Sequence, residues 1–521
     1  MKPSKYKIFF FFFFSVKVFS QNFLGASSGN YSGTNALPLN PADVVDGRYL
    51  LFMHVGGVGL DLQNNYARWS APFSFVTMAT GTYDDKYRTS PGGPLKWMNS
   101  YAGVNQNRKN IRMILNVEGR GPAIQYNNQK HKTGIAMGVR YRLMTSLNNT
   151  SEPVGEAIVT SLKSPNYTTN PSTGNAFTLN NGLYNEYFIT IGKVLKDEDE
   201  GFFKGGVTLK RFVSDFATNV TGTDIDYLLS RTPSNWKPGM MRTTIDLPKT
   251  EGSFSNVTAG SLGLSSLTKI NGLGTGFGLD LGLIYEFRPD GRKYEFTHNG
   301  QRVSDPTKNK YKYRIGFSIV DIGYLRYSDP GMVNVANVSS TNDRIEPDDF
   351  YKLKGTDGFI RSIENVYSLD PTTYQHSYTV LFPATTILSF DYAYSEKIYI
   401  HTIWRQSVLP GNRRGPIGHS GISVIPRYER KYFEFSAPIS LDNNYSNLNI
   451  GLAVRAGGLY LGSDNALGIF NVGNPRGISV YAGLFLPIYA RLPKSPLKCY
   501  YDENYKIKGY RKKKLSFFRK V

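Results

Sequence analysis

The most regular feature of the chain is an alternation of hydrophobic residues with small or charged ones. Residues 133–143 illustrate it, with one set formed by Ile135, Met137, Val139, Tyr141 and Leu143 and the other by Gly134, Ala136, Gly138, Arg140 and Arg142. A period of two is that of a β-strand, whose successive side chains point to opposite faces. Each such segment therefore predicts a strand with one apolar face and one face of tiny and charged residues.

The same alternation recurs at residues 276–288, 311–320, 388–394 and 450–457. A soluble sandwich would bury the apolar faces in a core and expose mainly Thr, Lys and Glu on the other side. Tiny residues combined with arginines suit the crowded lumen of a membrane barrel better, with the apolar faces turned to lipid. Aromatic residues gather near the strand ends, where barrels carry interfacial girdles.

We predict an all-β fold, a transmembrane antiparallel β-barrel of about 14 strands with long extracellular loops. The expected strands cover residues 48–62, 66–80, 111–117, 133–147, 184–196, 202–213, 274–288, 310–320, 385–395, 397–406, 418–428, 430–440, 447–457 and 477–488. The polar stretches 81–110, 148–183, 214–273 and 321–384 are predicted to be loops. The barrel is placed at residues 48–490, after an N-terminal lead at 21–47 that either plugs the lumen or lies in the periplasm.

Composition agrees with this fold class. Aromatic residues make up 14% of the 521 residues, and the chain has 52 glycines. The mean hydropathy of −0.34 argues against a helical membrane protein but not against a barrel, because barrel strands turn half of their residues to a polar lumen. The single cysteine, Cys499, excludes an intramolecular disulfide and is interpreted as an incidental thiol.

The first 20 residues have the layout of a secretory signal peptide. Lys2, Lys5 and Lys7 precede an apolar run at residues 8–14, and Ser20 offers a small residue for cleavage before residue 21. The run is too short for a membrane-spanning helix, although an uncleaved anchor is the alternative. No second stretch of 18 apolar residues follows, so we expect an exported protein that resides in the cell outer membrane as a closed barrel.

The net charge of +21 is concentrated at the ends of the chain. The first 20 residues carry +4 and residues 492–521 carry +8, which leaves +9 for the rest. No basic face or nucleic-acid motif accompanies this charge, so no nucleic-acid partner is expected. The basic tail at 491–521, with Arg511-Lys512-Lys513-Lys514, is interpreted as a solubilising segment; alternatively it contacts anionic lipid headgroups or an envelope protein partner.

No catalytic, cofactor-binding or metal-binding residue can be named, and we expect a protein that is not an enzyme and needs no cofactor. The six histidines lack ligand spacing, and no Gly-x-Ser-x-Gly elbow occurs. Charges on the small-residue faces are predicted to line the lumen: Arg140, Arg142, Lys210, Asp280, Glu286, Arg288, Lys312, Arg314, Asp391, Arg427, Glu429 and Arg455. They either form salt bridges that pack the lumen or form a cation-rich constriction that selects anionic solutes. The acidic members favour paired charges and therefore a plugged barrel.

Several strings resemble known outer-membrane proteins. Asn40-Pro41-Ala42 is similar to the Asn-Pro-Ala near the mature N-terminus of FadL-type fatty-acid transporters. Gly121-Pro122-Ala123, the segment 203–210 and the segment 276–282 resemble an uncharacterised family of outer-membrane barrels of Bacteroidota, some fused to an OmpA-type domain. The resemblance implies location and fold rather than a specific activity. Because this chain ends in a basic tail, anchoring to the cell wall through an OmpA-type domain is in doubt.

The function expected from these features is that of a non-enzymatic channel, transporter or envelope scaffold. A FadL-like carrier of hydrophobic ligands is one alternative and requires an apolar pocket in the lumen with a lateral opening. A structural partner protein in secretion or motility is another, and it predicts a plugged lumen and an envelope protein partner that copurifies through contacts with the long loops or the basic tail. A secreted soluble β-protein is the third.

Overall fold

The computed structural model describes residues 23–491, except for residues 97, 106–109, 161–170, 199, 234–240, 258–268, 299–300, 347–348, 350–354, 412, 419 and 474. The predicted signal peptide at 1–20 lies outside the described residues. So do Cys499 and the basic tail beyond Arg491, including Arg511-Lys512-Lys513-Lys514. These assignments stay predictions.

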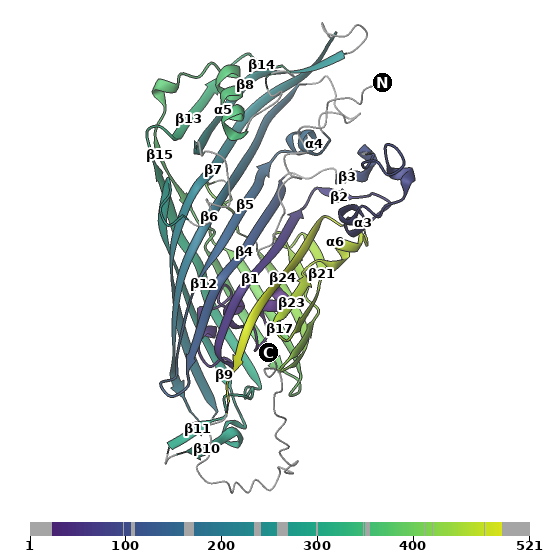
Figure 1. Cartoon of the computed structure of the whole chain (residues 1–521). Coiled ribbons are helices and arrows are strands. Elements are labelled where there is room, and N and C mark those ends of the chain that lie inside the picture. Colours follow the sequence, from purple (N-terminus) through teal and green to yellow (C-terminus); the bar gives the residue numbers. More distant parts are fainter. Residues whose placement is uncertain are drawn as a thin grey trace, which may run out of the picture.

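Antiparallel strands close into a barrel of 14 wall strands (Figure 1). The first wall strand, β1 (Tyr49–Asn64), pairs with β4 (Ile111–Asn128) on one side and with the last strand, β24 (Gly477–Tyr489), on the other. Continuing around the wall from β4 come β5 (Thr133–Thr150), β6 (Ser172–Asp197), β7 (Gly201–Pro233), β9 (Gly274–Phe287) and β12 (Tyr313–Ser328). The predicted transmembrane antiparallel β-barrel is confirmed.

The remaining wall strands are shorter, and three of them are interrupted. They are β15 (Ser377–Leu381) with β16 (Thr385–Ala393), β17 (Ile398–Ser407), β18 (Gly421–Arg430), β19 (Phe433–Ser436) with β20 (Ile439–Asp442), β21 (Asn447–Ile450) with β22 (Leu452–Ala456), and β23 (Leu459–Ser463). Pro383, Pro438 and Gly451 stand at the three interruptions. Proline has no N–H to donate to the ladder, so a strand bends or breaks where it occurs.

An extension rises from the extracellular end of the wall. The upper part of β7 pairs with β8 (Met241–Val257), and β8 pairs in turn with β13 (Val333–Ser340) and β14 (Asp343–Ile345). The helix α5 (Gly355–Val366) lies beside this sheet (Figure 1). The opposite end carries short turns and both ends of the wall, Tyr49 and Tyr489, which pair with each other. Short turns are typical of the periplasmic end of such barrels.

Small elements occupy the connections. They are α3 (Phe75–Thr80), α4 (Glu152–Thr160), α6 (Ala466–Phe470), the 3₁₀ turns η3 (Asp85–Tyr87), η4 (Asn99–Tyr101), η6 (Gly291–Tyr294) and η7 (Pro371–Thr373), and the short pairs β2 (Ala67–Trp69) with β3 (Ala102–Val104) and β10 (Glu295–His298) with β11 (Gln301–Ser304). Among the described residues, no helix is both long and apolar enough to cross a membrane.

The predicted number of wall strands is right, but two errors compensate each other. Residues 66–80 were predicted to be a wall strand, which is wrong: they form β2 and α3, because Pro72 interrupts the segment and the Ser74 side chain caps the helix by accepting a hydrogen bond from the Thr77 N–H. The short wall strand β23 was not predicted.

The predicted loops are also too long. Strands β6, β7 and β12 continue far into the stretches 148–183, 214–273 and 321–384, and β8 and β13 lie wholly within them. These strands stand above the membrane, where neither face needs to be apolar. The hydrophobic alternation that reveals a lipid-facing strand is therefore missing there.

The outward faces of the wall carry the hydrophobic residues. Met137, Leu209, Phe277 and Leu281 are 47%, 63%, 60% and 41% exposed, whereas the inward-facing neighbours of these residues are buried or partly buried. Exposed aliphatic and aromatic side chains on every wall strand would be unfavourable in water, but they match the hydrocarbon core of a bilayer.

Replacing an outward-facing leucine by arginine tests this assignment. Leu281→Arg should destabilise the barrel in phospholipid vesicles by about 2–4 kcal/mol, because a charge on the lipid face near the bilayer midplane is costly. The matched control is Thr275→Arg on the same face of the same strand, nearer the extracellular end, where the same charge costs little. Equal unfolding free energies for the two variants in denaturant titrations would contradict the assignment.

Candidate functional site: a lumen filled by the N-terminal segment

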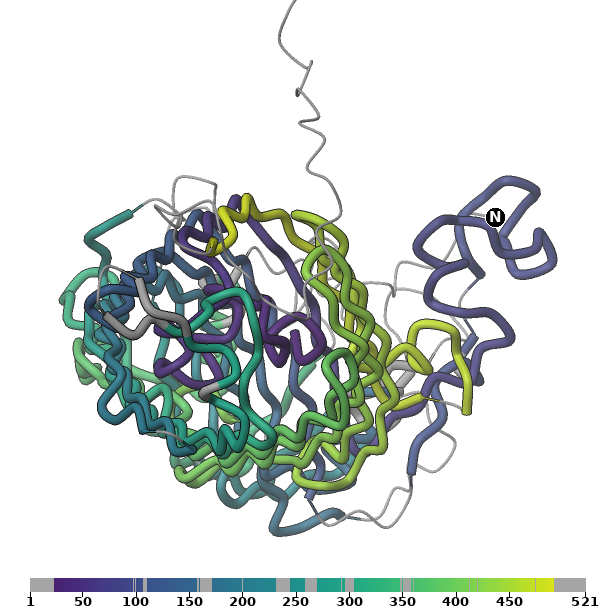
Figure 2. Tube along the Cα trace, turned by 90° about the horizontal axis from the view of Figure 1, so that it is seen from below, coloured from purple at the N-terminus to yellow at the C-terminus, as the bar shows by residue number. Residues whose placement is uncertain are grey.

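Residues 23–47, which we call the lumen segment, lie inside the ring of wall strands (Figure 2). The segment contains α2 (Leu24–Ser27), η1 (Gly33–Ala36) and η2 (Pro41–Val44). The Leu24 N–H donates to the Asp464 carboxylate over 3.0 Å, and the Gly25 N–H donates to the Tyr481 hydroxyl over 3.0 Å. The segment therefore follows the lumen from the upper part of β23 and β24 down to the start of β1.

A row of glycines on the wall provides space for this segment. Gly134, Gly192, Gly206 and Gly282 stand directly opposite one another on the four neighbouring strands β5, β6, β7 and β9. A Cβ atom on Gly206 would lie 2.4 Å from the Pro41 carbonyl oxygen, and one on Gly282 would lie 2.1 Å from Asn40 Oδ1. The tiny residues of the inward faces thus allow the segment to approach the backbone of the wall.

Two adjacent glycines of β7 allow a matched test of whether this row of glycines positions the lumen segment. Gly206→Val should displace the Pro41 backbone and make the lumen segment sensitive to added protease, because a Cβ there has no room. Gly205→Val is the control, since its Cβ would lie nearest to the side-chain ends of Leu195 and Leu283, at 3.2 and 3.3 Å, and 3.7 Å from the Gly282 carbonyl oxygen, which is ordinary contact. Limited proteolysis followed by mass spectrometry gives the readout. Equal protection of the lumen segment from protease in both variants would show that the row of glycines does not position it.

Asn40 anchors the turn that rests on the glycine row. Its side-chain oxygen accepts a hydrogen bond from the Ala42 N–H (2.9 Å), which caps η2, and Pro41 occupies the first position of that turn. Its side-chain amide donates to the carbonyl oxygens of Leu283 and Phe317, at 3.2 and 3.3 Å. One asparagine therefore caps the turn and fixes it to β9 and β12.

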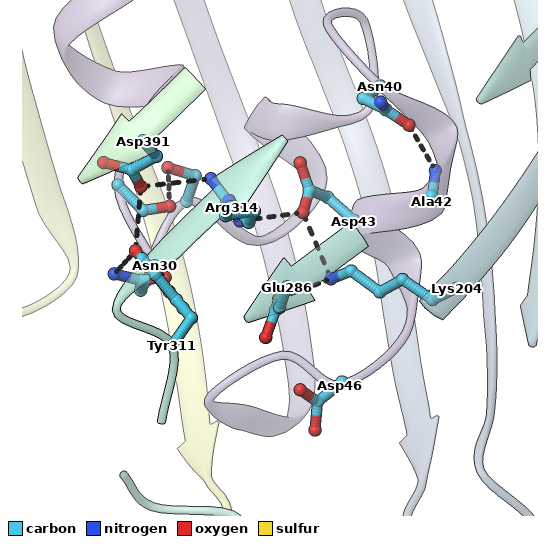
Figure 3. A network of polar contacts seen from close by, with 12 residues as sticks. Asn30, Asn40, Ala42, Asp43, Asp46, Lys204, Glu286, Tyr311, Arg314 and Asp391 are labelled. Carbon is cyan, nitrogen blue, oxygen red and sulfur yellow. Dashed lines mark hydrogen bonds and ion pairs between the residues drawn. The ribbon is translucent and has the colours of Figure 1, made fainter. Parts of the chain in front are cut away.

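Two aspartates of the lumen segment form ion pairs with the wall, and Figure 3 shows those of Asp43. Asp43 lies 3.3 Å from the Lys204 ammonium and 3.2 Å from the Arg314 guanidinium. Asp46 lies 2.7 Å from Arg288. Burial alone would raise the pKa of Asp46, but Arg288 and then Arg48 outweigh it and hold that pKa well below its ordinary range. Asp46 is therefore ionised at neutral pH, and its charge attracts the lumen segment to the cationic side chains of the wall.

A second polar group fixes the middle of the segment. The Asn30 backbone and side-chain amides donate to Glu429 over 3.0 Å each, and its side chain also bonds the Tyr311 hydroxyl. Tyr311 donates to Asp391 over 2.8 Å, and Arg427 bridges Asp391 and Glu429 at 2.7 and 3.2 Å. Two wall strands, β16 and β18, and the connection before β12 thus meet at Asn30 (Figure 3).

Eight charged side chains form a continuous chain of ion pairs on the wall between β4 and β12, which we call the wall network. In order of contact they are Arg120, Glu118, Arg140, Glu186, Arg142, Asp321, Lys210 and Asp280, with successive separations of 2.6, 2.7, 3.0, 3.0, 2.8, 2.7 and 2.7 Å. All but Asp321 are less than a tenth exposed. Four cations face four carboxylates, so the formal charges balance.

Asp321 reaches the network because β12 is irregular at that point. The pairing of β12 with β9 shifts register between Ile319 and Ile322, and Asp321 adopts a positive φ of 59°. Its N–H donates to the Asp280 carboxylate over 2.7 Å, which stabilises this unusual backbone conformation. A β-bulge is a common way to redirect one side chain of a strand.

Eleven of the twelve charges predicted to line the lumen are buried inside the barrel: Arg140, Arg142, Lys210, Asp280, Glu286, Arg288, Arg314, Asp391, Arg427, Glu429 and Arg455. Lys312 is different, because it precedes the first residue of β12. Its side chain is exposed, donates to the Ala393 carbonyl and lies 4.6 Å from the centre of the Tyr392 ring. For Lys312 the prediction of a lumen position is wrong.

The sequence prediction missed several partners of these charges. Glu118 and Arg120 continue the alternation of β4, but the predicted strand ended at residue 117. Glu186 lies within a predicted strand whose inward face was not assigned. Asp321 carries no signal in the sequence, because its inward position depends on the bulge.

The upper lumen contains a cluster of apolar side chains and a crossing loop. Phe382 stacks on Phe212 with ring centres 3.7 Å apart, within a buried cluster from β5, β6, β7, β12 and β15. The β17–β18 loop (residues 408–420) reaches across to β6, where the Gly415 N–H donates to Asn180 over 2.9 Å. Its Arg413 donates to the carbonyl oxygens of Leu381 and Pro416.

Small cavities interrupt this packing. One of about 20 Å³ is lined by His54, Arg120, Arg140 and Lys210, and another of about 30 Å³ lies between Asn30, Asp43 and Lys204. Each can hold one or two water molecules. Among the described residues, no group of three or more His, Cys, Asp or Glu is arranged to hold a metal ion.

Comparison with solved structures finds outer-membrane proteins. The translocator domain of the autotransporter NalP from Neisseria meningitidis is 9% identical, with a TM-score of 0.29 and coverage of 84% of this chain and 88% of that one. The toluene transporter TbuX from Ralstonia pickettii is 11% identical, with a TM-score of 0.35 and coverage of 88% and 94%. The toluene transporter TodX from Pseudomonas putida is 11% identical, with a TM-score of 0.29 and coverage of 90% and 99%.

Comparison of sequences gives a sharper result. No curated protein matches the chain. A family of unknown function, DUF5723, matches residues 41–464. This range begins within η2 of the lumen segment and ends just after β23, so it covers most of the wall. The resemblance to an uncharacterised barrel family is thereby confirmed, whereas an origin in Bacteroidota stays a prediction. The chain belongs to the family of unknown function DUF5723.

Proposed function

We propose that this protein is a non-enzymatic outer-membrane transporter that is closed at rest, and that its lumen segment is the gate. The observation that carries the proposal is the occupation of the lumen by residues 23–47. These residues fill space that the glycine row leaves free, and their polar contacts are made mainly by Asn30, Asn40, Asp43 and Asp46.

The polar contacts of the lumen segment are of a kind that a gate can exchange. Ion pairs and hydrogen bonds to a wall can be exchanged for contacts with water or with a solute, at a modest net cost per bond. A segment held by apolar packing alone would lose far more on release. The segment also has apolar contacts with the wall. Leu24 and Leu39 pack near Val320, Ile387 and Ile403. Phe23 and Tyr31 lie in a buried aromatic cluster with Tyr460 and Phe485, and Leu37, Val44 and Val45 pack against Ala136 and Phe188.

The paired charges argue against an ion-selective filter at rest. In the wall network every guanidinium and the ammonium group lies within 3.0 Å of a carboxylate. A filter for anions needs cationic groups whose charge is available to the solute. We therefore propose that any solute passes only after the lumen segment has moved.

Planar-bilayer recording tests the closed state directly. The purified full-length protein, shown to be inserted by its heat-modifiable migration on gels, should give no stable conductance steps. Ohmic steps from the unmodified protein would show an open pore and would overturn the proposal.

An envelope scaffold is the second candidate, and a specific observation favours it. The sheet formed by the upper part of β7 with β8, β13 and β14 rises above the wall together with α5, and it offers a broad ordered surface to a partner. Copurification of a stoichiometric envelope protein, lost when β8 and β13 are shortened, would favour the scaffold. The transporter predicts no such loss.

A further inference from the structure

A small lobe of the chain stands beside the extracellular end of the barrel. It contains β2, α3 and β3, all within residues 67–104, together with α6 and the residues that follow it up to 472; we call it the outer lobe. Figure 1 shows it at the upper right, and Figure 2 shows that its purple part lies outside the ring of wall strands. The lobe therefore projects sideways from the barrel.

The outer lobe is a packed unit with its own apolar centre. Ala71, Phe73 and Tyr101 are buried in it, and Trp69 stacks on Phe75 with ring centres 4.7 Å apart. The Trp69 indole N–H donates to the Phe73 carbonyl oxygen over 3.0 Å. The packing inside the lobe therefore defines its shape without help from the barrel.

Hydrogen bonds join the two parts of the lobe to each other and to the residues that precede β24. Asn471 donates its side-chain amide to the Ala71 carbonyl oxygen over 2.6 Å, and the Trp69 N–H donates to the Pro475 carbonyl oxygen over 2.9 Å. Residues 471 and 475 lead directly into β24. The height of the lobe above the lipid-facing wall is thus set by the first residues of β24.

Large apolar side chains on the lobe are exposed. Phe470 is 61% exposed and Val472 is 54% exposed, and both come from the connection between β23 and β24. The lipid-facing residues of these two strands begin close by in the chain, with Leu461 on β23 and Val480 on β24. Phe470 and Val472 therefore lie a few residues before the lipid-facing part of β24, with Arg476 as the one charged residue between Phe470 and Val480.

We propose that the outer lobe rests on the outer leaflet of the membrane, with Phe470 and Val472 inserted at the boundary of headgroups and acyl chains. A lobe that projects sideways from a membrane-spanning wall has the lipid surface beneath it. Aromatic and aliphatic side chains in this boundary region gain by leaving water, as they do in interfacial helices. The contact would fix the depth and the tilt of the barrel on one side.

Fluorescence from a probe at position 470 tests the contact. Phe470→Cys in a Cys499→Ser background is labelled with an environment-sensitive fluorophore, and the protein is folded into phosphatidylcholine vesicles. Met332→Cys is the matched control, because Met332 is 43% exposed in the turn between β12 and β13, on the extracellular extension. Heat-modifiable migration confirms that both labelled proteins are folded.

The expected result is a blue-shifted emission at position 470 that loses most of its intensity when the vesicles contain lipids with quenchers on their acyl chains. The probe at position 332 should keep an aqueous emission in the same vesicles. Aqueous emission at both positions would overturn the proposal. Shielding of position 470 in native outer-membrane fragments but not in pure lipid would also overturn it, because a protein partner would then cover the lobe.

Discussion

Removal of the lumen segment should convert a silent barrel into a conducting one. A variant without residues 23–45 keeps Asp46, which pairs with Arg288 beside the start of β1, and keeps every hydrogen bond between wall strands. It vacates the space above the glycine row, and water then solvates the side chains that Asn30, Asn40 and Asp43 contacted. We expect stable ohmic steps in planar bilayers where the full-length protein gives none.

Two further measurements separate the lumen segment from the crossing loop of the upper lumen. Replacing residues 410–418 by a short glycine-serine linker removes the contact of Gly415 with Asn180 but leaves the lumen segment in place, so this variant should stay silent. A synthetic peptide of residues 23–45 added on the side of the short turns should reduce the current of the deletion variant. If the deletion variant is folded and silent while the linker variant conducts, the loop and not the lumen segment is the gate.

The sequence predicts the wall of this barrel well wherever the wall touches lipid. Lipid demands an apolar outward face, and a narrow lumen demands small or paired inward residues, so every wall strand of sufficient length shows a period of two. This is why residues 133–143 and 276–288 are recognisable. The short strand β23 escapes notice because five residues, Leu459–Ser463, give too few repeats.

Contacts between distant segments are not predictable from this pattern. Alternation places Arg140 and Lys210 on the inner face, but it does not reveal that Glu118 or Asp321 lies opposite them. Alternation likewise says that Gly206 and Gly282 face inward, but not that they align across strands, because alignment depends on register. The register of the strands and one bulge bring the residues of the candidate site together, and both depend on the pairing of the whole sheet.

Breaking the wall network at its centre should cause the largest loss of stability of any single conservative change in the lumen. Glu186 accepts hydrogen bonds from Arg140 and Arg142, at 3.0 Å each, and all three side chains are less than a tenth exposed. Glu186→Gln removes one negative charge and leaves four buried cations of the network facing three carboxylates. A buried pair that loses one partner is destabilised by about 3–5 kcal/mol, because the remaining charge stays desolvated.

Asp224→Asn provides the matched control for the measurement. Asp224 pairs with Lys249 over 2.6 Å, but these two side chains are 43% and 44% exposed. Loss of a solvated pair should lower the free energy of unfolding far less than loss of Glu186 does, as measured by denaturant titration in vesicles. Equal losses for Glu186→Gln and Asp224→Asn would show that water reaches the network.

A double variant then distinguishes loss of charge balance from loss of packing. Glu186→Gln combined with Arg140→Gln restores equal numbers of cations and carboxylates, and Glu118 keeps Arg120 at 2.6 Å. The double variant should therefore be clearly less destabilised than the sum of the two single changes, as expected for residues that share one ion-pair network. Strict additivity would mean that the two residues act independently, and the stability of the lumen would then rest on packing against the lumen segment instead of on the paired charges.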